Sequence, residues 1–221
     1  MNEPRADLPL KSLILVPAVI TLAVTLLRLV GELLRWNPTF FSREPGGAGA
    51  IVGIVWLVPV FGGYFAWKLV QSGHAPGSLG RAIGIPLLAF LLFPASIAVA
   101  QKIGQPFGIA VVGAGCILAT LVALRAWPAL GRTLLAYGLA ARIPVVIVML
   151  VAILANWGTH YEFGPPSFPE MAALPKWFWI GLLPQLTLWI AFTVIVGGFV
   201  GGLTALAIGR RAAPTALSPA R

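Results

Sequence analysis

The apolar part of the chain begins with SLILVPAVITLAVTLLRLVGELLRW, which runs from Ser12 to Trp36 and decides the fold. Predominantly apolar runs of about 18 or more residues predict helices that cross a bilayer, and such runs recur along this sequence. Apolar residues make up 59% of the 221 residues and charged residues only 10%, whereas soluble domains carry about a quarter charged residues. The sequence therefore predicts an all-α integral membrane protein without a separate soluble domain.

The apolar runs and their boundaries predict a polytopic bundle of about six transmembrane helices with short loops. The predicted spans cover residues 12–36, 46–70, 83–102, 107–124, 139–157 and 177–208. Spans three and four, joined by a short turn at Gly104, should be antiparallel neighbours. One or two interfacial helices are also expected. One would cover the less apolar residues 126–138, and the other Phe168–Leu174, where Ser167 begins a capping-box pattern.

Three further predictions concern helix ends and kinks. Asn37 and Pro38 should end the first span, with Asn37 in the left-handed conformation. Pro59 should kink the second span. The sixth span is longer than one crossing needs, so it should tilt, kink at Pro184 or extend from the membrane.

The net charge of +9 is better explained by basic residues at membrane-helix ends than by nucleic-acid binding. An even number of spans places both termini on one side. With the N-terminus inside, ten basic residues are cytoplasmic: Arg5, Lys11, Lys68, Arg81, Arg125, Arg132, Arg142, Arg210, Arg211 and Arg221. Only Arg35, Arg43, Lys102 and Lys176 lie outside. The bias predicts cytoplasmic termini in the cell membrane, with residues 1–11 as an N-terminal tail and 209–221 as a basic, disordered C-terminal tail.

Two opposite charges, Arg28 and Glu32, interrupt the first span. Counted from Ser12 at 1.5 Å per residue, Arg28 lies roughly 24 Å and Glu32 roughly 30 Å along the helix, near the far side of a hydrocarbon core about 30 Å thick. Residues four apart share a helix face and can pair. The pair is either a polar site that faces the bundle interior or a vestibule, or a snorkelling Arg with an interfacial Glu that orients the helix.

The segment NWGTHYE, residues 156–162, is the most chemically varied heptad of the chain. The alternation of sides places it at the same level as Glu32. A pair of His160 with Glu32 or with Glu162 would relay protons or sense pH, because His titrates nearest neutrality. Alternatively the segment is an interfacial loop with aromatic anchors and a solvated His160. The candidate polar vestibule comprises Arg28, Glu32, Asn156, His160 and Glu162.

No sequence motif for a metal site, a phosphate-binding loop or a catalytic set occurs, so we predict no catalytic, cofactor-binding or metal-ligating residue. Cys116 is the one cysteine, which excludes an intrachain disulfide.

Three function classes stay open. The first is a small transport or permeation module in the lipid bilayer with an outward-facing polar vestibule, although few polar residues are predicted near the midplane, where substrates usually bind. The second is an accessory or structural subunit of a larger membrane complex, or a homo-oligomer, with an interface on Gly197, Gly198, Gly201 and Gly202. The third is a membrane enzyme that acts on a lipid-linked substrate at the outer face, with His160 or Glu32 as acid or base. We favour the first class.

Overall fold

The computed structural model describes residues 10–45, 50–165 and 168–212, and every regular element in these ranges is helical. The elements are α1 (Leu10–Leu33), α2 (Leu57–Gln71), α3 (Leu79–Ile103), α4 (Phe107–Ala123), α5 (Pro128–Ala155), the 3₁₀ turn η2 (His160–Glu162), α6 (Ala173–Trp177), the π-helical turn η3 (Phe178–Leu182), α7 (Leu183–Leu186) and α8 (Leu188–Ala212). Within the described ranges, four segments are long and apolar enough to cross a membrane: α1, α3, α5 and the run Ala173–Gly209. The all-helical prediction is confirmed, with four such segments where six were predicted.

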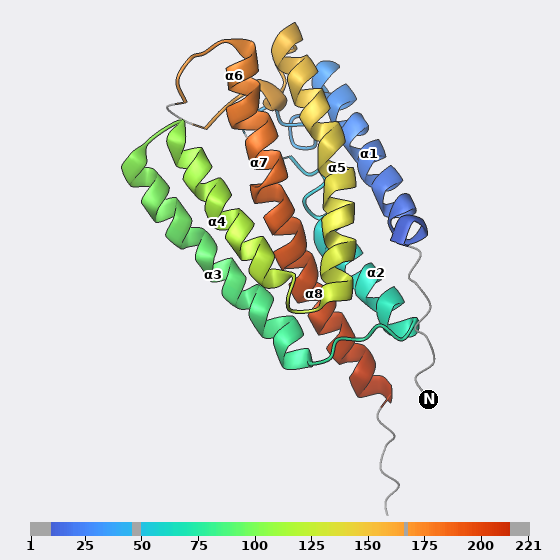
Figure 1. The fold of residues 1–221 in the computed structure, drawn as a ribbon. Coiled ribbons are helices and arrows are strands. Elements are labelled where there is room, and N and C mark those ends of the chain that lie inside the picture. The colour runs from blue at the N-terminus through green and yellow to red at the C-terminus, as the bar shows by residue number, and fades with distance from the viewer. Residues whose placement is uncertain (1–9, 46–49, 166–167, 213–221) are drawn as a thin grey trace, which may run out of the picture.

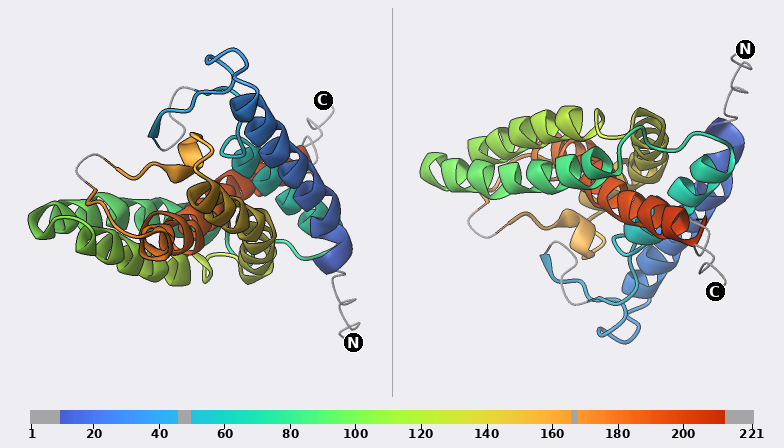
Figure 2. Two further views of the ribbon diagram at one scale, coloured as in Figure 1. Left: turned by 90° about the horizontal axis from the view of Figure 1, so that it is seen from above. Right: turned by 90° about the horizontal axis from the view of Figure 1, so that it is seen from below.

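Helix α8 is the central element of the bundle, in contact with α2, α3, α4 and α5 (Figure 1). Helices α3 and α4 are antiparallel neighbours, as predicted, and extend away from the rest on one side (Figure 2). Helix α1 lies on the opposite side, where it packs against α5 and, over a smaller area, α2. Large apolar side chains such as Val16 of α1 and Leu88 of α3 are exposed, as expected for helices that face lipid.

The glycines of α8 let other helices of the same chain approach closely. A Cβ on Gly62 of α2 would lie 2.6 Å from the Gly197 backbone, and one on Gly201 would lie 2.4 Å from a Leu130 methyl group. A Cβ on Gly202 would lie 2.8 Å from the Ala82 carbonyl oxygen of α3. The glycine face of α8 is therefore covered by other helices of the same chain. That this face binds a second chain stays a prediction, and the observed packing does not favour it.

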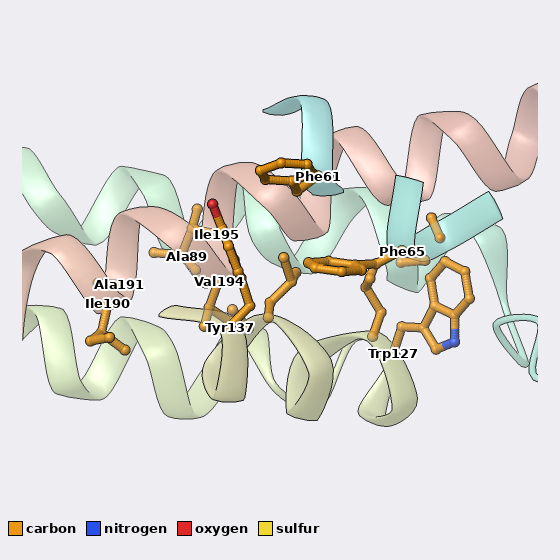
Figure 3. Close-up of a cluster of buried hydrophobic side chains, with 14 of the residues drawn as sticks. Phe61, Phe65, Ala89, Trp127, Tyr137, Ile190, Ala191, Val194 and Ile195 are labelled. Carbon is orange, nitrogen blue, oxygen red and sulfur yellow. The ribbon is translucent and has the colours of Figure 1, made fainter. Parts of the chain in front are cut away.

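The predicted interfacial helix over 126–138 is wrong, because residues 128–138 belong to one long helix, α5, which begins at Pro128. Leu130, Leu134 and Tyr137 recur at helical spacing and are no more than 1% exposed. Their apolar face packs on protein rather than on a membrane surface: the rings of Phe61 and Phe65 each lie with their centroid 5.4 Å from that of Tyr137 (Figure 3). The fifth helix therefore begins eleven residues before the predicted start at 139 (139 − 128 = 11).

The second predicted span, 46–70, is helical only in its second part. Residues 50–56 are described but form turns and bends, and α2 begins at Leu57. Pro59 is the third residue of α2, a position where its missing N–H costs no intrahelical hydrogen bond, so it marks a helix start rather than a kink. Residues 46–49 of this span lie outside the described ranges.

Further differences concern helix ends. Arg35, not Asn37, adopts the left-handed conformation after α1, with φ 53°. Residues 168–172 are not helical, so the expected helix over Phe168–Leu174 is wrong, and Ser167 lies outside the described ranges. The predicted interruption near Pro184 is found: η3 precedes this proline, and Thr187 separates α7 from α8. Helix α8 extends to Ala212, into the predicted tail, and residues 1–9 and 213–221 are not described.

Candidate functional site

Arg28 and Glu32 form a buried ion pair one helical turn apart on α1. The Arg28 Nε donates to Glu32 Oε1 at 2.8 Å. The same guanidinium donates from Nη1 to the Val52 carbonyl at 2.9 Å and from Nη2 to the Ser42 carbonyl at 3.1 Å. Between them, the Phe41 ring packs directly on the backbone of Gly31. A Cβ at position 31 would lie 2.2 Å from the ring, so only glycine fits there. Arg28 therefore ties α1 to the two non-helical segments that follow it.

His160 binds the same carboxylate, and its ring shares Oε1 with Arg28. Its Nδ1 lies 2.6 Å from Glu32 Oε1, and its backbone N–H donates to Glu32 Oε2 at 3.0 Å. Because an ionised carboxylate only accepts hydrogen bonds, Nδ1 carries the proton in this contact. The other ring nitrogen, Nε2, has no hydrogen-bond partner among the described residues. Of the two pairs that the sequence left open, the structure forms the one with Glu32.

The chain reaches this position through a tightly specified turn after α5. Asn156 ends the helix in the left-handed conformation with φ 50°, and Gly158 follows with φ 69°. Thr159 and Glu162 then form a capping box: Glu162 Oε1 accepts from the Thr159 backbone N–H at 2.9 Å and from its hydroxyl at 3.0 Å. Asn156 and Glu162 thus build the turn that presents His160, and neither lines the cavity described next.

A cavity of about 520 Å³ opens beside the Arg28–Glu32–His160 cluster. Its polar lining consists of Thr25, Arg28, Arg142, His160, Tyr161 and Gln185. The apolar walls come from α1, residues 50–59, α5, η3 and α8, and they include Val24, Ile54, Val145, Met149, Ile180, Phe192 and Val196. Known ligand pockets have volumes of about 300–1,000 Å³ and a similar mixture of apolar walls with few polar groups. The cavity is therefore large enough for a small organic ligand.

Irregular backbone forms one wall of this cavity. Residues 50, 51 and 53–56 line it, and the Val52 carbonyl is held by Arg28. Non-helical backbone at membrane depth is tolerated where it is buried in protein or lines a water-filled space, because its polar groups then find partners. A Cβ on Gly53 would come within 3.1 Å of the Arg28 guanidinium, so the glycine permits this close approach.

Arg142 also lines the cavity and is only 4% exposed. It follows the start of α5 by fourteen residues (142 − 128) and precedes its end by thirteen (155 − 142), which puts it roughly 20 Å from either end at 1.5 Å per residue. Its Nη1 donates to Gln185 Oε1 at 3.4 Å, and its guanidinium lies 4.6 Å from the centre of the Trp189 ring. Its Nε has no hydrogen-bond partner, and no carboxylate pairs with it among the described residues.

The environment of η2 shifts the protonation of its two aromatic residues. Burial is the largest cause that lowers the pKa of His160 below its ordinary value, and the positive charge of Arg28 acts in the same direction against the attraction of Glu32. We therefore assign a neutral imidazole at pH 7. Burial, and then the negative charge of Glu32, raise the pKa of the Tyr161 hydroxyl, so it stays protonated. The two rings lie with their centroids 3.9 Å apart and their planes tilted by 39°.

Sequence reasoning missed Arg142 and Gln185 as residues of one cavity. Arg142 was assigned to the cytoplasmic end of a span that was thought to begin at 139, and the true start at Pro128 moves it to the middle of the helix. A usable signal was present: Leu130, Leu134, Tyr137 and Ala141 continue one apolar helical face upstream of Arg142. The described residues contain no group of three His, Cys, Asp or Glu side chains that could hold a metal ion.

Comparisons with protein families, with curated proteins and with solved structures found no match to this chain.

Proposed function

We propose that the chain crosses the cell membrane six times with both termini in the cytoplasm, and acts as a small transport or permeation module. In this proposal the cavity is a polar vestibule that opens on the outer side beside His160. The observation that carries it is the position of Arg142. Arg142 is buried halfway along an apolar helix, lines the cavity and has no carboxylate partner among the described residues. It supplies the polar group near the midplane that a transport site needs.

The six crossings combine the four long apolar segments with α2 and α4. The 17 residues of α4 span roughly 25 Å and the 15 residues of α2 roughly 22 Å, so α2 alone is short for a core of about 30 Å. Residues 50–56, which precede it, would complete the crossing as an unwound segment. Unwound segments beside a binding site are common in transporters. Helix α1 begins and α8 ends toward the same end of the bundle (Figure 1), which supports two termini on one side.

Uptake into vesicles tests this function. The purified chain is reconstituted into phosphatidylcholine vesicles, and uptake of radiolabelled octanesulfonate, rubidium ion and glycerol is measured, so that an organic anion, a cation and a neutral solute are compared. We expect protein-dependent uptake of at least one solute, reduced by Arg142→Gln. The matched control is Arg132→Gln, because Arg132 is exposed on the same helix. Uptake no faster than in protein-free vesicles for all three solutes would overturn the proposal and favour an accessory subunit.

The second candidate is a membrane enzyme that acts on a lipid-linked substrate. The Glu32–His160 contact favours it, because a carboxylate that holds Nδ1–H leaves Nε2 as a general base at the cavity. The described residues offer no nucleophile beside that nitrogen, since the polar lining contains only Thr25 and Tyr161 as hydroxyl groups. We therefore rank transport first.

A further inference from the structure

The charges around the cavity add up to an unmatched positive charge. Glu32 is 1% exposed and is already bound by Arg28 and His160. Glu162 accepts from Thr159 within its own turn. Arg142 therefore faces the cavity without a counter-charge from the described residues, and its Nε proton is buried without an acceptor. A buried charge without a partner is costly, and proteins retain such charges mainly where a ligand or function uses them.

The groups around Arg142 favour an anion over a neutral ligand. Gln185 approaches with its carbonyl side at 3.4 Å and turns its amide toward the Met149 sulfur at 3.7 Å, so neither contact neutralises the guanidinium. Trp189 covers one face of the guanidinium, which leaves the edge with the N–H donors for an acceptor. Arg donors in a planar fork match the oxygens of a carboxylate, a sulfonate or a phosphate ester.

The remaining cavity wall indicates what the anion is attached to. Apart from its polar groups, the lining is formed mainly by aliphatic and aromatic side chains, among them Ile54 and Val145. Three large apolar side chains of the lining are also exposed: Ile51 is 58%, Trp56 53% and Phe163 46% exposed. An apolar chain on such a wall is removed from water, and this favours binding. A small inorganic anion would leave this wall without a contact.

We propose that Arg142 is the binding residue of a site for an amphiphilic monoanion, whose charged head contacts Arg142 beside Gln185 and Trp189 and whose apolar chain lies against the cavity wall toward Ile54 and Phe163. The ligand is either a free organic anion or the acidic headgroup and chain of a lipid. This inference rests on the proposed function in that it names the class of transported solute. Binding at Arg142 is nevertheless measured separately from transport.

The test is isothermal titration of the full chain in phosphatidylcholine nanodiscs with octanesulfonate, a permanent monoanion with an apolar chain. Two matched ligands separate head from chain: methanesulfonate has the same head, and octanol has the same chain. We expect saturable binding of octanesulfonate, with both matched ligands at least about tenfold weaker, because octanol lacks the charged hydrogen bond to Arg142 and methanesulfonate lacks the chain that is buried on the apolar wall. Equal affinity for octanol and octanesulfonate would overturn the proposal.

Three variants complete the test. Arg142→Gln should weaken octanesulfonate binding about tenfold or more, Arg142→Lys should fall between that variant and wild type, and Arg132→Gln should bind as wild type. Binding that is unchanged in Arg142→Gln overturns the proposal. If Arg142→Gln does not fold by circular dichroism, the comparison of Arg142→Lys with Arg132→Gln decides, and equal affinities overturn the site.

Nanodiscs that contain phosphatidylglycerol distinguish the two sources of the anion. Competition with octanesulfonate that is weaker in Arg142→Lys than in wild type assigns the site to an acidic lipid, and no competition assigns it to a free organic anion. The outcomes for transport are independent of these results. Binding at Arg142 without uptake of any solute refutes the transport module and keeps the site, whereas uptake without Arg142-dependent binding refutes the site and keeps the module.

Discussion

Arg28 and Arg142 are both more than nine-tenths buried, with 8% and 4% of their surfaces exposed, yet their surroundings differ in kind. The Arg28 guanidinium donates to one carboxylate and to two backbone carbonyls of separate segments. The Arg142 guanidinium has one long contact to a neutral amide and a buried N–H without an acceptor. Arg28 therefore stabilises the fold by connecting three segments, whereas Arg142 has a charge and a donor that no group of the described residues matches. Burial alone therefore does not separate a structural charge from a functional one, but the inventory of partners does.

The largest effect is expected at the Arg28 end, from Glu32→Ala. This change leaves Arg28 without its counter-charge and removes the acceptor of two His160 donors, so we expect a loss of about 3–5 kcal/mol in the free energy of unfolding. Unfolding in mixed detergent, titrated with sodium dodecyl sulfate, measures it. Glu44→Ala is the matched control because Glu44 is exposed. Equal stability of the two variants would contradict a structural role for the Arg28 cluster.

At the other arginine we expect a change of opposite sign. Arg142→Met replaces a buried charge that lacks a carboxylate partner with an apolar side chain of similar length, so it should raise the free energy of unfolding by about 1 kcal/mol. The same titration measures it, with Arg28→Met as the paired variant that should lose stability. Loss of stability in both variants would mean that Arg142 also has a structural role.

The contrast between the two arginines also explains how far the sequence could be interpreted. Arg28 and Glu32 are four residues apart on one helix, so their contact follows from helical geometry alone. The pairing of His160 with Glu32 is one of two alternatives that the sequence offers. It depends only on placing the end of the first span and the loop after the fifth span on the same side of the membrane. The role of Arg142 depends on where α5 begins. A segment with polar residues between apolar ones is compatible both with a membrane surface and with a protein interface, and only the packing of Leu134 and Tyr137 decides between them.

Residues 50–56 were unpredictable for a related reason. Their small and β-branched apolar side chains fit a membrane helix by composition, and nothing local indicates an unwound segment. Tertiary hydrogen bonds keep this segment out of a helix. The Val52 carbonyl accepts from Arg28, 24 residues earlier in the chain. The N–H groups of Ile51 and Val52 donate to the carbonyls of Thr39 and Phe40. Hydrogen bonds of this kind replace the helical ones, and they form only once the chain has folded around Arg28.

The smallest expected effect is the pH dependence of the Arg28 cluster. Burial and Arg28 lower the pKa of His160 in the folded chain, while Glu32 opposes them. The unfolded chain then binds the proton more readily, since its His titrates near pH 6.5. The stability that this neutral histidine contributes is therefore complete above about pH 6.5 and is lost as the pH falls below that value toward the folded pKa. In His160→Asn, a side-chain N–H that does not titrate replaces Nδ1–H, so stability should change less between about pH 6.5 and 5. His74→Asn, at the chain's other histidine, is the control, and detergent unfolding across this range measures all three proteins. A wild-type chain that becomes more stable on acidification would mean that Glu32 outweighs burial, and His160 would then be the cation of the pair with Glu32.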